Sequence, residues 1–140
     1  MTINVVELEI IINDLEQLVQ NHIVDMSEYR IKPNELNYPC GTPGCHAGWL
    51  GLACGLTSGN YINGAQVFAT RIGFYCDLEV EMTEWFSDHP HIWGNNYGYE
   101  MFCLPEALGQ TEQRFPATVL VDHWRGVIDR LTDWKTKANG

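Results

Sequence analysis

The sequence predicts a mainly α-helical, irregular single domain, residues 1–140, that packs around a central glycine-rich helix. Its 140 residues fit one domain. Apolar residues recur at the three- and four-residue steps of a helix near both ends of the chain, whereas only one short segment, residues 78–82, alternates as a strand does. A domain of this length buries roughly two-thirds of its unfolded surface, so we expect it to fold without a disulfide or a metal.

The N-terminal helix is the clearest element. Asn4 with Glu7 three residues later is typical of a helix N-terminus. One apolar stripe follows at steps of three and four residues: Val5, Leu8, Ile12, Leu15 and Val19. We expect the helix to end near Ile23 and His22 to be a core-edge histidine rather than a ligand.

The predicted central helix begins within a glycine-rich segment, Cys40-Gly41-Thr42-Pro43-Gly44-Cys45-His46-Ala47-Gly48-Trp49. Thr42 suits the N-cap, and Pro43 suits the first helical position, where its missing N–H costs nothing. We expect the helix to run from residue 43 to about residue 54, with Gly55 as its stop. Small residues give it a flat face for close packing against another helix or backbone: Gly44, Ala47, Gly48 and Gly51.

The rest of the chain mixes short elements with one long C-terminal helix. Residues 65–72 predict a helix stopped by Gly73, residues 78–82 a short strand, and Thr83 the cap of a short turn. Residues 87–103 read as an irregular aromatic segment, which packs onto the core or carries function. The last helix begins near Pro116, with His123 at the edge of its core face, which comprises Leu120, Trp124, Val127, Ile128 and Leu131.

The chain is strongly acidic, with a formal net charge of −10. No Lys or Arg lies between Arg71 and Arg114, and that gap contains Asp77, Glu79, Glu81, Glu84, Asp88, Glu100, Glu106 and Glu112. Binding to nucleic acid or to an anionic membrane requires clustered cations, so we expect neither. An acidic surface suits a basic protein partner, or serves solubility alone.

The chain shows no signal for export or for membrane insertion. No apolar run approaches the roughly 18–20 residues that span a bilayer, and the N-terminus lacks a basic region. We therefore expect a cytoplasmic protein whose five cysteines are reduced: Cys40, Cys45, Cys54, Cys76 and Cys103.

Thiol chemistry is conceivable at Cys40 and Cys45 because a helix N-terminus lowers the pKa of a thiol. Their spacing, however, is C-x4-C rather than the C-x-x-C of thiol–disulfide enzymes. His46 is the next residue, so on a helix it points about 100° away from Cys45 and is badly placed as its base. Packing at a tight helix entry is the favoured interpretation.

A metal site is a second alternative for the same segment. Cys40, Cys45 and His46 could supply ligands together with His89 or His91. Structural zinc sites usually show two close ligand pairs, and His89-Pro90-His91 is unusually tight for the second pair. We favour His89 and His91 as loop residues exposed to water, and we assign no catalytic, cofactor-binding or metal-binding residue.

The central segment resembles a family of small uncharacterised bacterial and phage proteins with a CGT-x-x-C-x-AGW core. The residues that carry the resemblance are Asp25-Met26, Cys40-Gly41-Thr42, Cys45, Ala47-Gly48-Trp49, Gly73-Phe74 and Trp85-Phe86. This chain differs in having Val24 where a Phe often stands, and in a longer aromatic loop from residue 93 to 102. The resemblance implies a helical cytoplasmic domain in a bacterium or phage, with no established activity.

Together these features predict a non-enzymatic protein-interaction module. Its acidic middle, or the aromatic residues Trp93, Tyr97, Tyr99 and Phe102, would contact a protein partner. In a phage setting that partner could be a host or defence protein, reached by mimicking the charge of DNA. The alternative is a thiol- or metal-dependent small enzyme or ligand-binding protein that uses Cys40, Cys45 and the nearby histidines.

Overall fold

Short helices dominate the computed structural model, which describes residues 3–26, 43–56, 61–74 and 80–139. This part of the chain is mainly α-helical, as predicted. Its elements, in order, are α1 (Val5–Leu18), β1 (Ile23–Asp25), β2 (Pro43–Gly44), α2 (His46–Ala53), α3 (Tyr61–Arg71), α4 (Val80–Asp88), α5 (Pro90–Trp93), η2 (Gly98–Glu100), η3 (Pro105–Leu108), β3 (Arg114–Pro116) and α6 (Thr118–Asn139).

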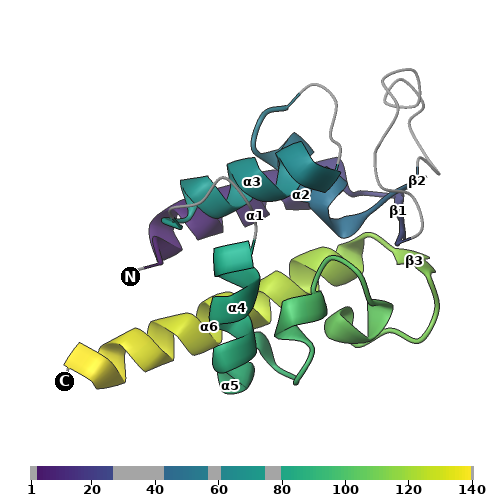
Figure 1. Cartoon of the computed structure of the whole chain (residues 1–140). Helices are drawn as coiled ribbons and strands as arrows, with labels where there is room; N and C mark the ends of the chain where they lie inside the picture. The colour runs from purple at the N-terminus through teal and green to yellow at the C-terminus, as the bar shows by residue number, and fades with distance from the viewer. Residues whose placement is uncertain (1–2, 27–42, 57–60, 75–79, 140) are drawn as a thin grey trace.

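The helices form two layers (Figure 1). In one layer α1 contacts α2, and α2 packs on α3; in the other, α5 and η3 contact the long helix α6, and α4 contacts α5. The layers meet where α1 packs against α6 and where Trp124 of α6 lies against Phe68 of α3, 5.0 Å between ring centroids. Phe86 and Trp93 also pack on Trp124, so one aromatic cluster joins the two layers.

Helix α1 begins as predicted, because the Asn4 side chain accepts a 3.0 Å hydrogen bond from the Glu7 backbone N–H. Its predicted core stripe is buried at Leu8, Ile12, Leu15 and Val19, whereas Val5 is only partly buried. The predicted end near Ile23 is wrong. The helix stops at Leu18 because the following residues form β1, which pairs antiparallel with β3 and parallel with β2.

The start of the central helix also differs from the prediction. Pro43 and Gly44 pair with Ile23 and Val24 as strand β2 instead of opening the helix. Helix α2 therefore starts at His46, and Cys45 is its N-cap: the Cys45 Sγ accepts a 3.3 Å hydrogen bond from the Gly48 N–H. Thr42, the predicted cap, lies outside the described residues. The predicted stop is confirmed, since Gly55 has a φ of +96°.

The flat face of α2 packs against α3. A Cβ on Gly64 of α3 would lie 2.1 Å from the Ala47 carbonyl oxygen, and a Cβ on Gly51 would lie 2.7 Å from the Gly64 Cα. The two backbones thus touch where side chains are absent. Seven of the eight residues of α2 are buried, which confirms a buried glycine-rich helix at the centre of the fold.

The strand expected at residues 78–82 is wrong in its described part, because Val80–Asp88 forms α4; residues 78 and 79 lie outside the described residues. The chain follows a helical period here, with Met82 and Phe86 buried four residues apart. Thr83 lies inside α4 rather than capping a turn. Residues 87–103 are more regular than expected, since they contain the end of α4, all of α5 and all of η2.

The remaining helix predictions are close to the structure. Helix α3 starts at Tyr61, four residues before the predicted start, and is followed by Gly73 with a φ of +107°. Helix α6 starts at Thr118 because Pro116 is held in β3 opposite Ile23. Its predicted core face is buried throughout. Among the described helices, none combines the length and apolar character needed to cross a membrane.

Candidate functional site

The Cys45–His46 pair is built into the core. Cys45 is 1% exposed, and His46 is completely buried. The His46 Nδ1 lies 2.9 Å from the carbonyl oxygen of Met101, and its Nε2 accepts a 2.9 Å hydrogen bond from the Trp124 Nε1–H. Burial lowers the pKa of His46 to about 3, against the opposing effect of the Met101 carbonyl. Both ring nitrogens are therefore occupied, and neither serves Cys45 as a base.

The two loop histidines differ from each other. His89 is half-buried and stacks on Trp85, with 3.9 Å between ring centroids and 15° between ring planes. Its Nδ1 lies 2.7 Å from the Trp85 carbonyl oxygen. The expectation that His89 is exposed to water is therefore wrong, because its ring is half-buried against the ring of Trp85. His91 is exposed, as predicted.

These residues do not assemble into a metal site within the described part of the chain. Residues 3–26, 43–56, 61–74 and 80–139 contain no group of three or more His, Cys, Asp or Glu side chains placed to hold an ion. Cys40 and Cys76 lie outside those residues. Cys54 and Cys103 are free thiols, and burial raises the pKa of Cys54 to about 11, which makes it a poor nucleophile at neutral pH.

The cations of the described residues are all engaged. Four basic side chains form ion pairs: Arg71 with Glu7, Arg114 with Asp25, Arg125 with Glu16 and Lys137 with Asp133. The other two, Arg130 and Lys135, donate hydrogen bonds to backbone carbonyl groups. No Lys or Arg of the described residues forms an ion pair with a carboxylate of residues 80–113.

Residues 80–113 carry six carboxylates and no Lys or Arg. None of the six takes part in an ion pair within the described part of the chain: Glu81, Glu84, Asp88, Glu100, Glu106 and Glu112. Glu84 and Asp88 are exposed, and Glu81 is half-buried. These three follow steps of three and four residues, so they share one side of α4.

Two exposed tyrosines flank Gly98, the first residue of η2, which contacts α4. Tyr97 is 43% exposed and Tyr99 is 53% exposed. Gly98 between them touches α4 so closely that a Cβ there would lie 2.7 Å from the Phe86 carbonyl carbon and 2.8 Å from the Ser87 nitrogen. We call the acids of α4 together with the tyrosines and the acid of the adjoining segment the tyrosine–acid face: Glu81, Glu84, Asp88, Tyr97, Tyr99 and Glu100.

The predicted aromatic contact set divides in two. Trp93 and Phe102 are buried: the Trp93 Nε1–H donates a 3.0 Å hydrogen bond to the Ala107 carbonyl, and the Phe102 ring lies 5.1 Å from that of His46. Both side chains belong to the hydrophobic core, so they are not available to contact a partner protein. Only Tyr97 and Tyr99 remain on the surface.

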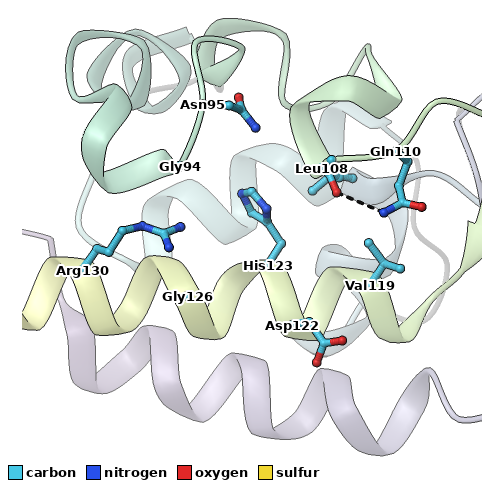
Figure 2. Close-up of a pocket in the computed structure, with 10 residues that line it drawn as sticks. Gly94, Asn95, Leu108, Gln110, Val119, Asp122, His123, Gly126 and Arg130 are labelled. Carbon is cyan, nitrogen blue, oxygen red and sulfur yellow. Dashed lines mark hydrogen bonds between the residues drawn. The ribbon is translucent and has the colours of Figure 1, made fainter.

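A cavity of about 450 Å³ lies between α6 and the segments around residues 94–95 and 108–110 (Figure 2). The prediction placed His123 at the edge of the core face of α6, and the structure puts it, half-buried, in the wall of this cavity. The cavity itself was not predicted. A sequence signal was available, however, in a second stripe of α6 at steps of three, one, three and four residues: Val119, Asp122, His123, Gly126 and Arg130.

Comparisons of the chain with protein-family models, curated proteins and solved structures found no match. The resemblance of the Cys40–Trp49 segment to a bacterial and phage family therefore stays a prediction.

Proposed function

We propose that this protein is a non-enzymatic interaction module that binds an arginine-rich segment of a partner protein on its tyrosine–acid face. The observation that carries the proposal is the set of carboxylates in residues 80–113, none of which has an ion-pair partner in the described part of the chain. A bound basic segment would supply the missing positive charge.

The acidic charge favours the association of such a partner in two ways, through its rate and through its binding energy. A surface of one sign raises the rate at which an oppositely charged partner arrives. Each exposed ion pair contributes only about 0.5 kcal/mol, so several must act together. In this proposal Glu84 and Asp88 of α4 and Glu100 of η2 act on one short segment, because the two elements are in contact at Gly98.

The tyrosines favour arginine as the partner residue. Tyrosine and arginine are both enriched at the residues that dominate binding energy in interfaces. A guanidinium over an exposed tyrosine ring contributes about 0.5–1 kcal/mol. Tyr97 and Tyr99 expose their rings although most large apolar residues of the described chain are buried. In a phage setting, a basic host or defence protein would be such a partner.

Fluorescence anisotropy with a short labelled arginine-rich peptide tests the proposal. The triple reversal Glu84→Lys, Asp88→Lys and Glu100→Lys should weaken binding at least about tenfold, because three pairs of about 0.5 kcal/mol are lost. The double change Tyr97→Ala and Tyr99→Ala leaves the net charge unchanged and should still weaken binding about fivefold. Binding should weaken as salt rises through the physiological range.

The matched control reverses three other exposed acids, Glu9, Asp14 and Asp129, which lie outside residues 80–113 and form no ion pair in the described chain. It changes the net charge by the same amount. An equal loss in the control, or no loss in the tyrosine variant, would reduce the interaction to general charge attraction and contradict a defined face.

A further inference from the structure

Three aromatic rings meet at the edge of the core where α4 crosses α6 (Figure 1). The rings of Trp85 and His89 stack with 3.9 Å between their centroids. The ring of Trp134, from α6, lies 5.6 Å from the first and 5.7 Å from the second, at 83° and 75° to their planes. Because these two distances are nearly equal, Trp134 lies beside the stack rather than on top of it. We call this cluster the aromatic patch.

The patch contains the two tryptophans that reach the surface. Trp85 and Trp134 are half-buried, whereas the other three, Trp49, Trp93 and Trp124, are at most 2% exposed. The inner sides of Trp85 and Trp134 pack on the core, so part of each side chain faces solvent. An indole is the ring that attracts a cation most strongly, and tryptophan is enriched among the residues that dominate binding energy in interfaces.

His89 adds a hydrogen-bond acceptor to the patch. Its Nδ1 lies 2.7 Å from the carbonyl oxygen of Trp85, and a carbonyl can only accept, so Nδ1 carries the proton. The Nε2 of the neutral ring is then an acceptor. This atom has no hydrogen-bond partner among the described residues and, unlike the Nε2 of His123, it is not buried. It is therefore available to an N–H group of a ligand.

Two carboxylates border the patch. Glu81 and Asp88 lie four residues before and three residues after Trp85, so the three residues share one side of α4. Neither acid has an ion-pair partner in the part of the chain that the structure describes. Both acids belong to the tyrosine–acid face, so the aromatic patch extends that face towards α6.

We propose that the aromatic patch anchors one arginine side chain of the basic partner segment, with the guanidinium on the exposed indole surface of Trp85 and Trp134. One guanidinium N–H donates to the Nε2 of His89, and the carboxylates of Glu81 and Asp88 balance the charge. This inference rests on the proposed function and deepens it, because it names the side chain that the partner must supply and the place where that side chain binds.

The arrangement of the rings favours arginine over other cations. A quaternary ammonium group such as that of trimethyllysine binds between rings that surround it. The centroids of the patch are only 3.9 to 5.7 Å apart, so these three rings contact one another and leave no such gap between them. A guanidinium is planar and weakly hydrated and stacks on a ring surface, whereas the ammonium group of lysine is compact and strongly hydrated.

Acrylamide quenching of the tryptophan emission of the full chain tests the anchor without a mutation. The probes are short peptides in which glycine alternates with arginine, lysine or trimethyllysine, so that their charges are equal. Because the other tryptophans are buried, acrylamide quenches mainly Trp85 and Trp134. A saturating arginine peptide should remove most of this quenching. It should also bind about threefold more tightly than either of the other peptides.

The outcomes separate the anchor from the proposed function. If none of the basic peptides binds, both are wrong. If the arginine peptide binds but leaves the quenching unchanged, the basic partner stands and the anchor is overturned. Equal affinity for the lysine or trimethyllysine peptide would also overturn the assignment of arginine to this patch.

Variants of the patch locate the contact by calorimetry with the arginine peptide. Trp134→Leu removes one indole and should weaken binding about threefold, whereas the matched control Trp134→Phe keeps a ring and should retain most of the affinity. His89→Phe keeps a ring on Trp85 but removes the acceptor, so it should also weaken binding about threefold. Thermal unfolding verifies that each variant is folded. Unchanged affinity in a folded Trp134→Leu would overturn the anchor, and unchanged affinity in His89→Phe would overturn the hydrogen bond to Nε2.

Discussion

The indole Nε1–H of Trp124 donates a 2.9 Å hydrogen bond to the Nε2 of His46. Trp124 lies on α6 and His46 opens α2, so this bond joins the two helical layers inside the core. The second ring nitrogen of His46 faces the Met101 carbonyl. Because the Nε2 accepts, the proton lies on Nδ1, and a neutral histidine satisfies both neighbours.

Removing this histidine should destabilise the protein strongly. His46→Ala leaves the Trp124 N–H and the Met101 carbonyl buried without partners and opens a cavity, so we expect a loss of about 3–5 kcal/mol in the free energy of unfolding. His46→Gln should lose clearly less, since an amide offers one acceptor and one donor. Urea unfolding of the three proteins measures both values, and equal losses in the two variants would contradict the paired role.

Acid should destabilise the protein before its carboxylates titrate. The folded pKa values of His46 and His123, about 3 and about 4, lie below the unfolded value of 6.5. As the pH falls below 6.5, the unfolded chain binds protons that the folded chain excludes, so the free energy of unfolding falls by up to about 1.4 kcal/mol per pH unit for each histidine. The slope from these two groups halves at about pH 6.5 and nearly vanishes above about pH 7.5.

Unfolding at a series of pH values between 7.5 and 5 measures this dependence. His46→Gln removes one titrating group and should reduce the slope by about a third to a half, since burial also lowers the pKa of His22. If that variant is too unstable, His123→Leu should give a similar reduction. A stability that stays level down to pH 5, or rises on acidification, would contradict the burial of neutral histidines.

The contact between α2 and α3 should not tolerate a methyl group. A helical glycine changed to alanine with room to spare gains up to about 1 kcal/mol. At Gly64 the new Cβ would meet the Ala47 carbonyl oxygen at 2.1 Å, so Gly64→Ala should instead lose about 3 kcal/mol of stability. Thermal and urea unfolding decide the sign, and any gain in stability would show that the two helices are further apart.

Alkylation should distinguish the cysteines by their surroundings. Cys103 is exposed, whereas Cys45 is 1% exposed and burial raises the pKa of Cys54. With iodoacetamide under native conditions, Cys103 should react at least tenfold faster than Cys45 or Cys54, because the thiolate is the reactive form and must be reached. Peptide mass mapping over time measures each site separately. Fast labelling of Cys45 would revive the thiol hypothesis.

Several features of the fold follow from local sequence. The core faces of α1 and α6 were predicted because apolar spacing along a helix depends only on neighbouring residues, and Leu8, Leu15, Trp124 and Leu131 are all buried. The stop at Gly55 follows equally locally, from a left-handed backbone that glycine adopts easily.

The predictions of secondary structure were wrong where contacts with distant segments of the chain outweigh local conformational preference. Pro43 and Gly44 are residues typical of the start of a helix. In the structure both pair with β1 as a strand, so Cys45 becomes the N-cap of α2. The acidic alternation before Thr83 resembled a strand, yet burying Met82 and Phe86 on one side requires a helix. Similarly, the neighbouring sequence does not indicate that Trp93 is buried whereas Tyr97 is exposed.

The sequence by itself determined the helical class, the acidic charge and the buried glycine-rich helix, since composition and local periodicity are properties of neighbouring residues. Only the tertiary structure decided that His46 bonds Trp124 across the two layers, and that His123 and Arg130 border a cavity roofed by residues 94–95 and 108–110. Those groups are separated along the chain, and only long-range packing determines which polar atoms meet and which remain unpaired.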